Sequence, residues 1–300
     1  LNIPKEIGER IRASWGADEL SLYGRFDFIL AKDGTPKILE FNADTPTSLL
    51  EASVIQWQWK EDVFPECDQF NGIHEGLVQS WKDIFPKKGE IHFAGALENN
   101  EDTVTLPYLA STAIEAGSST RVLDMQALDL QNGRFFDPAG ELVNRCFKLY
   151  PWEWMVDESP DGCLAEMEWL EPIWKLVMSN KAIATLYELF PDSPYVLPCY
   201  LSRPRSGLFC KKPVFSREGH NVSVVDIRDW EEYVRIAETE GDYNTGAYVY
   251  QEYVEPTAYS GRYPVIGSWI IGGEAAGIGI RENRMEVTDN LSEFVPHIIG

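Results

Sequence analysis

Apolar and polar residues alternate along two segments near the start of the chain, residues 22–30 and 37–41. Because successive side chains of a β-strand point to opposite faces, each segment predicts a strand with one apolar and one polar face. The residues between them predict a tight hairpin, closed by a two-residue turn at 33–34 or by a four-residue loop at 33–36. Either even length keeps the two polar faces side by side, whereas a loop of odd length would separate them.

The polar faces of this hairpin carry residues that suit a metal ion. The two-residue turn places Asp27 opposite Glu40 and Arg25 opposite Asn42. Two carboxylates that face each other across a ladder repel, which favours a bound cation, and hard oxygen ligands suit Mg²⁺ together with substrate phosphates. The pattern therefore predicts a magnesium site at Asp27, Glu40 and Asn42. The alternative is an ordinary hairpin whose polar face is solvated and whose carboxylates pair with Arg25.

The rest of the first half predicts a mixture of helices and strands. Helices are expected at 46–59, 73–85 and 106–117, extended segments at 91–97 and 121–125, a hairpin at 134–148, an acidic loop at 155–162, and a long helical region at 166–190 interrupted at Pro172. A strand, a helix and a second strand in succession form a βαβ unit, so we expect a small parallel sheet.

The second half predicts a largely antiparallel arrangement. Strands are expected at 207–215, 221–226, 247–254, 265–271 and 274–281, with one helix at 229–240. The chain as a whole therefore belongs to the mixed α/β, or α+β, class.

Composition narrows the range of partners. The 300 residues include 26 Lys and Arg against 48 Asp and Glu, a formal net charge of −22. This charge disfavours nucleic acids and anionic membranes and favours a cationic partner, although an acidic surface can also serve solubility alone. We find no run of about 18 apolar residues and no signal-peptide pattern, so we expect a soluble, cytoplasmic protein. The chain begins at Leu1 rather than Met, which indicates a longer parent protein.

Basic and glycine-containing segments of the second half predict contacts with a polyphosphate. The strand with Lys211 and Lys212 leads into a loop that contains Arg217 and Gly219, and such a loop can offer backbone N–H groups to phosphates. An ordinary surface hairpin is the alternative. The backbone of residues 251–254 can hydrogen-bond an adenine ring, or can belong to an edge strand that ends at a proline.

Seven segments then stand in order along the chain: YGRFDF, LEFNADTPTSL, FKLYPWEWM, SNKAIATL, KKPVFSREGHNV, GSWIIGGEAAGIGIRE and FVPH. Together they resemble the synthetase domain of the glutathionylspermidine synthetase family, which is of the ATP-grasp type. The resemblance runs from Tyr23 to the end of the chain. It implies an ATP-grasp fold with the nucleotide between two antiparallel sheets, plus a small βαβ unit like a pre-ATP-grasp domain.

The resemblance also implies roles for individual residues. It matches Asp27, Glu40 and Asn42 to magnesium ligands, and Arg25 and Arg281 to catalytic arginines that stabilise the transferring phosphoryl group. It matches Lys181 and Lys212 to lysines that hold the nucleotide phosphates, the loop of residues 216–221 with Arg217 and Gly219 to the loop that covers them, and Ser48 and Glu101 to the sites of the thiol peptide and the amine. The strand pattern itself, not the resemblance, places Gln251 and Tyr253 at the adenine ring. His220 departs from the family pattern, because a small residue is usual there.

The function implied is ATP- and Mg²⁺-dependent formation of an amide between a glutathione-like carboxylate and a spermidine-like polyamine, through an acyl phosphate. No residues resemble the cysteine amidase domain of bifunctional members, so hydrolysis is not expected. The alternatives are a ligase for another acid and amine, and a nucleotide-binding regulatory protein without turnover. The expected divisions are an N-terminal part with the metal-binding hairpin (1–90), a substrate-binding α/β unit (91–165), a nucleotide lid (166–245) and the rest of the core (246–300). Oligomeric state is left open.

Overall fold

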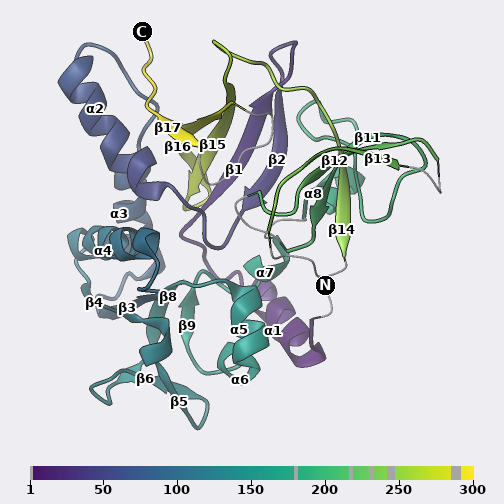
Figure 1. The fold of residues 1–300 in the computed structure, drawn as a ribbon. Coiled ribbons are helices and arrows are strands. Elements are labelled where there is room, and N and C mark those ends of the chain that lie inside the picture. Colours follow the sequence, from purple (N-terminus) through teal and green to yellow (C-terminus); the bar gives the residue numbers. More distant parts are fainter. Residues whose placement is uncertain (1–2, 179–181, 216–218, 230–232, 242–246, 285–291) are drawn as a thin grey trace.

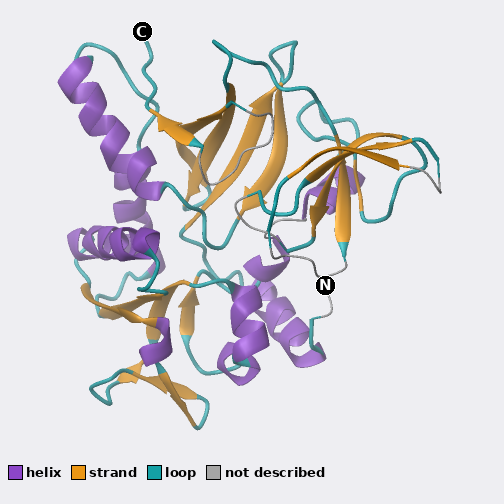
Figure 2. Ribbon diagram, viewed as in Figure 1, coloured by secondary structure: helices purple, strands orange, loops and turns teal. Residues whose placement is uncertain are grey.

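The computed structural model describes residues 3–178, 182–215, 219–229, 233–241, 247–284 and 292–300. This part of the chain has a mixed α/β architecture with two five-stranded sheets, one four-stranded sheet and one three-stranded sheet. Figures 1 and 2 show the two larger sheets in the upper part of the view and the smaller ones below, with a column of helices along one side. The mixed α/β class expected from the sequence is confirmed.

The first sheet has the order β17-β16-β15-β1-β2 and is antiparallel throughout. Its strands are β1 (Tyr23–Leu30), β2 (Pro36–Asn42), β15 (Tyr263–Ile271), β16 (Glu274–Asn283) and β17 (Glu293–Val295). The first four were expected from the alternating pattern and are confirmed. The sheet joins strands from the two ends of the chain, so β1 lies between β2 and β15 (Figure 1).

The hairpin between β1 and β2 reaches the expected register by another route. Its loop has three residues, 32–34, closed by the hydrogen bond from the amide of residue 31 to the carbonyl of residue 35, and Gly34 adopts a φ of +80°. The even loop lengths expected from the sequence are therefore wrong. A β-bulge at Leu39 compensates, because Asp27 pairs with Glu40 whereas Phe28, the next residue of β1, pairs with Ile38, two positions earlier in β2. The inserted residue returns the polar side chains of both strands to one face.

The second sheet has the order β10-β14-β11-β12-β13 and is also antiparallel. Its strands are β10 (Cys199–Tyr200), β11 (Gly207–Pro213), β12 (Ser223–Ile227), β13 (Tyr233–Glu238) and β14 (Tyr248–Glu252). The helix expected at 229–240 is wrong, since residues 233–238 pair with β12. Every residue of β13 is exposed. Its aromatic and β-branched residues favour a strand. A helix at this position would have no apolar face buried against the rest of the protein, because every residue is exposed.

The third sheet is parallel and has the order β4-β3-β8-β9. Its strands are β3 (Glu90–Gly95), β4 (Ser119–Asp124), β8 (Arg145–Leu149) and β9 (Glu168–Leu170). The expected βαβ unit is confirmed, because β3 and β4 are parallel and flank helix α4 (Asn100–Glu115). A three-stranded antiparallel sheet extends from this unit and consists of β5 (Asp129–Gln131), β6 (Arg134–Phe136) and β7 (Leu142–Val143).

The remaining helices lie around the sheets (Figure 1). They are α1 (Lys5–Gly16), α2 (Gln56–Val63), α3 (Ile73–Ile84), α5 (Trp152–Glu158), α6 (Pro160–Cys163), α7 (Lys175–Met178) and α8 (Ala182–Leu189), with a π-helical turn at Glu51–Ile55 and a 3₁₀ turn at Met125–Ala127. None of the helices in the described part of the chain is long and apolar enough to cross a membrane.

Four expectations for helical and loop segments need correction. The helix expected at 106–117 is α4, which begins at Asn100. The helix expected from residue 46 begins at Glu51 instead. The acidic loop expected at 155–162 is mostly helical, because Trp152 and Met155, three residues apart, bury one face of α5. The long helical region expected at 166–190 contains β9, whose Trp169 and Leu170 are buried, before the short helices α7 and α8.

The largest apolar core lies between the first sheet and the α/β unit. It joins Tyr23 and Trp269 of the first sheet to Trp81 of α3, Leu106 of α4 and Phe147 of β8. The ring of Tyr23 stacks on Trp269 with centroids 6.0 Å apart and lies 5.8 Å from Phe147. Strand β1, which carries the predicted metal ligand Asp27, is therefore packed directly against the α/β unit.

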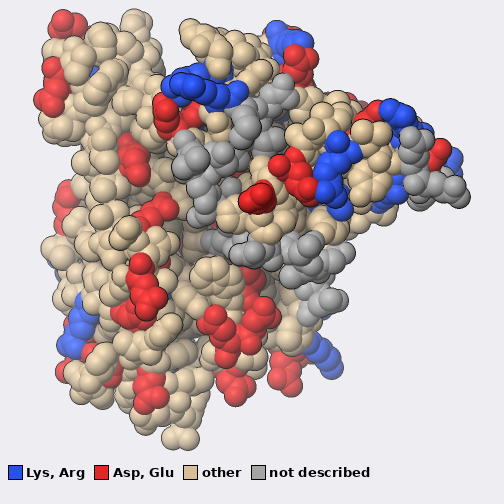
Figure 3. Space-filling model, viewed as in Figure 1, with Lys and Arg blue, Asp and Glu red and all other residues tan. Residues whose placement is uncertain are grey.

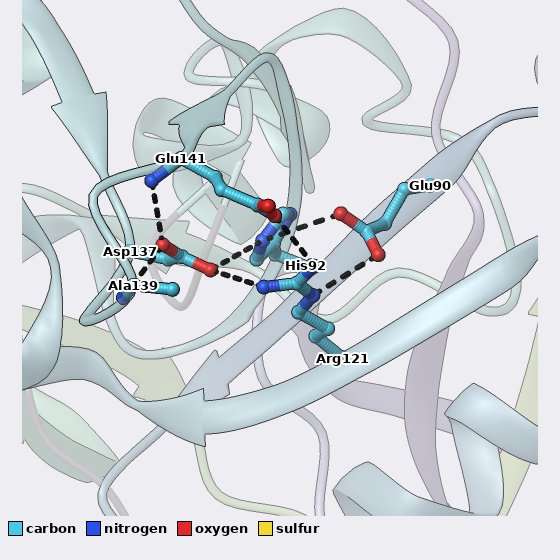
Figure 4. Close-up of polar contacts among 6 residues, drawn as sticks. All are labelled: Glu90, His92, Arg121, Asp137, Ala139 and Glu141. Carbon is cyan, nitrogen blue, oxygen red and sulfur yellow. Dashed lines mark hydrogen bonds and ion pairs between the residues drawn. The ribbon is translucent and has the colours of Figure 1, made fainter.

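A cluster of charged residues holds the β6–β7 turn against the parallel sheet (Figure 4). Arg121 of β4 pairs with Glu90 at 3.0 Å, with Asp137 at 2.6 Å and with Glu141 at 2.5 Å. His92 of β3 is 2 % exposed and its Nε2 lies 3.9 Å from carboxylate oxygens of Glu90 and Asp137. This cluster therefore joins three elements of the α/β unit.

Candidate active site

The polar residues of β1 lie on a buried face of the first sheet. Arg25 is 4 % exposed and Asp27 is 2 % exposed, whereas the phenylalanines on the opposite face of β1 are only half-buried. The alternative of a solvated polar face is therefore wrong for these two residues, although the ion pair it expected between them is present. Asn42 lies opposite Arg25, and Glu40 lies opposite Asp27, as the sequence predicts.

Asp27 is the centre of the hydrogen bonds on this face. Its Oδ1 accepts from Nε of Arg25 at 2.6 Å, and its Oδ2 accepts from Nη2 of Arg25 at 2.9 Å, which makes a forked ion pair. Oδ2 also accepts from Nη2 of Arg281 at 2.7 Å and from Nδ2 of Asn42 at 3.3 Å. Since Arg281 comes from β16, the fold brings both predicted arginines onto one predicted metal ligand.

The charges of this group compensate one another. Burial raises the pKa of Asp27, but the guanidinium groups of Arg25 and Arg281 outweigh burial and hold that pKa below its ordinary value of 3.8. Burial lowers the pKa of Arg25, and Asp27 more than restores it. Repulsion from Arg25, followed by burial, lowers the pKa of Arg281. The buried carboxylate therefore stays ionised between two cations.

The donors on this face fit Mg²⁺ in kind. Nδ2 of Asn42 donates to Oδ2 of Asp27 at 3.3 Å and to Oε1 of Glu40 at 3.2 Å, so the amide side chain of Asn42 contacts both carboxylates. Within the described ranges, no group of three or more His, Cys, Asp and Glu side chains is placed to hold a metal ion. The trio has only two carboxylates, and a magnesium site of this kind takes its other ligands from water and substrate phosphates.

Gly267 of β15 makes room for the forked pair. It lies opposite Asp27 in the sheet, and a Cβ at this position would come 2.7 Å from Cδ of Arg25. Any larger residue would require the side chain of Arg25 to shift. Gly267 is not among the site residues expected from the sequence, where its only signal is that of a glycine inside the apolar strand 263–271.

The second sheet contributes Lys212 and Gln251 at the edge of β2. Nζ of Lys212 donates to Oε1 of Gln251 at 2.8 Å and to the carbonyl of Leu39 at 3.3 Å. Nε2 of Gln251 donates to the carbonyl of Ile38 at 2.9 Å. The bulge at Leu39 thus lies beside a lysine, one residue from Glu40. The structure brings these two predicted nucleotide contacts together and next to the predicted metal ligands.

Two further predicted nucleotide contacts, Tyr253 and Gly219, lie in the described part of the chain. Tyr253 follows β14 and its amide donates to the carbonyl of Leu208 at 3.0 Å. Gly219 adopts a φ of +70°, which favours glycine. Lys181 and Arg217 lie outside the described residues.

Ser48 and Glu101, the two predicted substrate residues, are in direct contact. The amide of Ser48 donates to Oε1 of Glu101 at 2.9 Å, and Ser48 adopts a φ of +64°, a conformation that few residues other than glycine adopt. Next to it, the carbonyl of Thr47 accepts from Nη1 of Arg25. The substrate segment and the metal face therefore share Arg25, a link that alternation along β1 alone does not reveal.

Comparison with known proteins agrees with this geometry. The model of the family described as glutathionylspermidine synthase pre-ATP-grasp matches residues 1–300. The chain belongs to this family. A protein of Haemophilus influenzae named "Putative acid--amine ligase" is 38 % identical over 303 residues, covering 96 % of this chain and 77 % of that protein.

Two further relatives are longer. The trypanothione synthetase of Crithidia fasciculata is 28 % identical over 98 % of this chain, and the bifunctional glutathionylspermidine synthetase/amidase of Escherichia coli is 26 % identical over 100 % of it. The chain spans 50 % and 53 % of their respective lengths. The names of these relatives indicate an acid–amine ligase of the glutathionylspermidine and trypanothione synthetase family.

A solved structure shows the same fold. It is titled as a "Putative gamma-glutamylcysteine synthetase" from Methylobacillus flagellatus and matches with a TM-score of 0.62, covering 97 % of this chain and 84 % of the other. The sequence identity is 10 %, so the likeness concerns the fold.

Proposed function

We propose that this chain is an ATP-grasp ligase that uses ATP and Mg²⁺ to join a carboxylate to an amine through an acyl phosphate. The acid is a glutathione-like peptide and the amine a spermidine-like polyamine. The observation that carries the proposal is the convergence of Arg25 and Arg281 on Asp27, beside Glu40 and Asn42. This is a compact set of hard oxygen donors flanked by two guanidinium groups.

The residues divide into three roles. Asp27, Glu40 and Asn42 would hold Mg²⁺, which supplies charge neutralisation for the phosphates of ATP when bound. Lys212, Gln251, Tyr253 and Gly219, with Lys181 and Arg217 outside the described residues, would hold the nucleotide between the two antiparallel sheets. Arg25 and Arg281 lie where they can stabilise negative charge on a phosphoryl group in transfer.

The substrate part of the site would lie at the contact between Ser48 and Glu101. Glu101 stands in the first turn of α4, next to the buried carboxylate of Asp102. The carboxylate of Glu101 would attract an ammonium group and hold the amine near the activated acid. On the face shown in Figure 3, acidic side chains are scattered over the upper and lower parts, and most Lys and Arg side chains lie in the upper part, over both five-stranded sheets. This distribution supports a cationic substrate.

The proposal is tested by ADP release from the protein with Mg²⁺ and ATP, with glutathione and spermidine added separately and together. We expect release only with both substrates, and a product mass equal to their sum less water. Release with another acid and amine would keep the ligase chemistry and change its substrates. ATP binding without turnover across a panel of acids and amines would contradict the proposal and favour a regulatory nucleotide-binding protein.

A further inference from the structure

The loop of residues 43–48, here called the exit loop, leads from the metal strand β2 toward the π-helical turn. Two contacts with proposed active-site residues hold its far end. The carbonyl of Thr47 accepts from Arg25, and the amide of Ser48 donates to Glu101 at 2.9 Å. The conformation of this loop therefore decides how the substrate contacts lie relative to the phosphoryl-transfer residues.

The near end of the exit loop is held by a buried lysine of the α/β unit. Lys148 of β8 is 0 % exposed, and its Nζ donates to Oδ1 of Asp44 at 2.6 Å and to the carbonyl of Tyr150 at 2.9 Å. The second oxygen of Asp44 accepts from the amide of Trp152 at 2.9 Å, and the ammonium lies 4.4 Å from the centroid of the Trp152 ring. Both oxygens of Asp44 are thereby fixed from β8 and the start of α5.

A second buried lysine holds the preceding residue. Lys175 is 1 % exposed, its Nζ donates to the carbonyl of Ala43 at 2.7 Å and to that of Tyr23, and it pairs with Glu171 at 2.6 Å. Oε1 of Glu171 accepts from the amide of Tyr23 at 3.1 Å. Consecutive residues of the exit loop are thus held by two ammonium groups from separate segments of the chain.

Buried ion pairs of this kind contribute little to the free energy of unfolding, because the cost of removing both charges from water offsets their attraction. Burial lowers the pKa of Lys148 and of Lys175, and the partner carboxylates only partly offset it. Well-packed apolar side chains often stabilise such a position as well or better, so a charged pair is retained more readily where it fixes a geometry. The geometry fixed here is that of the exit loop.

We propose that Lys148 is a positioning residue, which acts through Asp44 to set the exit loop and with it the binding of the acid substrate. This role rests on the proposed function, whereas its structural basis does not. Lys148 touches neither the metal face nor the second sheet in the described contacts, so its loss should leave nucleotide binding in place.

The first test measures the loop itself and needs no turnover. Hydrogen exchange with mass spectrometry should show that Lys148→Met speeds amide exchange in peptides that cover the exit loop, while peptides from β11 and β14 exchange as in the wild type. Lys60→Met is the matched control, because Lys60 is 9 % exposed and paired with Glu61 at 2.6 Å on α2. Unchanged exchange in the exit loop of Lys148→Met would overturn the proposal, whatever the protein catalyses.

The second test separates positioning from stability. In the ligase assay, Lys148→Met should raise KM for the acid by about tenfold or more, since small misplacements of substrate contacts are costly, and leave KM for ATP within about twofold. The double variant Asp44→Asn/Lys148→Met has no unpaired buried charge, so it should regain thermal stability but not the KM for the acid. Recovery of both would show that the pair serves stability alone. Equal changes in the KM values for acid and ATP would also overturn the positioning role.

Discussion

Arg25 and Asp27, two residues apart on β1, form a forked ion pair with Nε–Oδ1 and Nη2–Oδ2 distances of 2.6 and 2.9 Å. The same carboxylate also accepts from Arg281 at 2.7 Å. One buried carboxylate thus balances two guanidinium groups as well as facing Glu40. Its removal should affect stability and chemistry separately.

Asp27→Ala should lower the free energy of unfolding by about 3–5 kcal/mol, because it leaves buried cations without their partner. It should also abolish Mg²⁺-dependent ADP release. Urea unfolding measures the first effect and a coupled ADP assay the second. Glu40→Gln is the comparison, since Glu40 is half-buried and hydrogen-bonded to Asn42 at 3.2 Å. It should lose turnover while its stability changes by less than about 1 kcal/mol. A wild-type rate in either variant would remove that residue from the metal site.

Gly267→Ala should lower kcat without preventing folding, because the added Cβ would lie 2.7 Å from Cδ of Arg25 and displace its side chain. We expect a loss of at least about tenfold in kcat/KM, the size associated with small shifts of catalytic groups. Gly8→Ala in α1 is the matched control. A Cβ there meets nothing within 4 Å, and the change should raise stability by about 0.5–1 kcal/mol without affecting the rate. Full activity of Gly267→Ala would show that Arg25 tolerates displacement.

Lys212→Met should raise KM for ATP by about tenfold, since a charge-assisted contact to phosphate contributes roughly 1.5–3 kcal/mol. The neighbouring Lys211→Met is the control, because adjacent strand residues point to opposite faces and the ammonium of Lys211 lies 3.8 Å from the centroid of the Tyr248 ring. Steady-state kinetics with varied ATP distinguishes them. An equal rise in both variants would indicate a general loss of positive charge rather than a specific contact.

The pairing of Asp27 with Glu40 follows from the sequence because strand alternation fixes which residues share a face. The loop length and the bulge that produce this pairing do not follow from the sequence. An odd hairpin loop and a bulge at Leu39 each shift the faces, and the two shifts cancel. Neither feature leaves a strong local signal, so the sequence predicts the register of Asp27 and Glu40 correctly and the loop length incorrectly.

Long-range contacts are the other part that local patterns miss. The position of Arg281 next to Asp27 depends on the strand order of the first sheet. The ion pair between Lys148 and Asp44 joins residues that are 104 positions apart in the sequence. The sequence predicts a helix rather than the strand β13 for a related reason. All residues of β13 are exposed, and pairing with β12 rather than burial determines its conformation.

Glu101→Ala should raise KM for the amine more than KM for ATP, because the carboxylate that binds the amide of Ser48 would also attract an ammonium group. An increase of about tenfold is expected for the loss of one charged contact. Glu98→Ala provides the control, since Glu98 belongs to the same acidic turn and is exposed. An unchanged KM for the amine in Glu101→Ala would exclude this residue from the substrate site.

The stability of the α/β unit should depend on pH through His92 (Figure 4). Burial lowers the pKa of His92 below its ordinary value of 6.5, outweighing the opposite effect of Glu90 and Asp137. The unfolded chain therefore binds a proton more readily than the folded one, and stability falls as the pH drops from 6.5 toward the lower folded pKa. Above 6.5 both states are neutral at this residue, and the contribution is constant.

His92→Gln removes this titration and isolates its effect from that of other groups. The free energy of unfolding of the wild type, minus that of the variant, should be level between about pH 7 and pH 8 and shrink toward about pH 5. Urea unfolding of both proteins across this range measures the difference. A difference that stays level or widens at low pH would mean that protonated His92 gains ion pairs with Glu90 and Asp137, which lie 3.9 Å from its Nε2, at least as strong as its cost of burial.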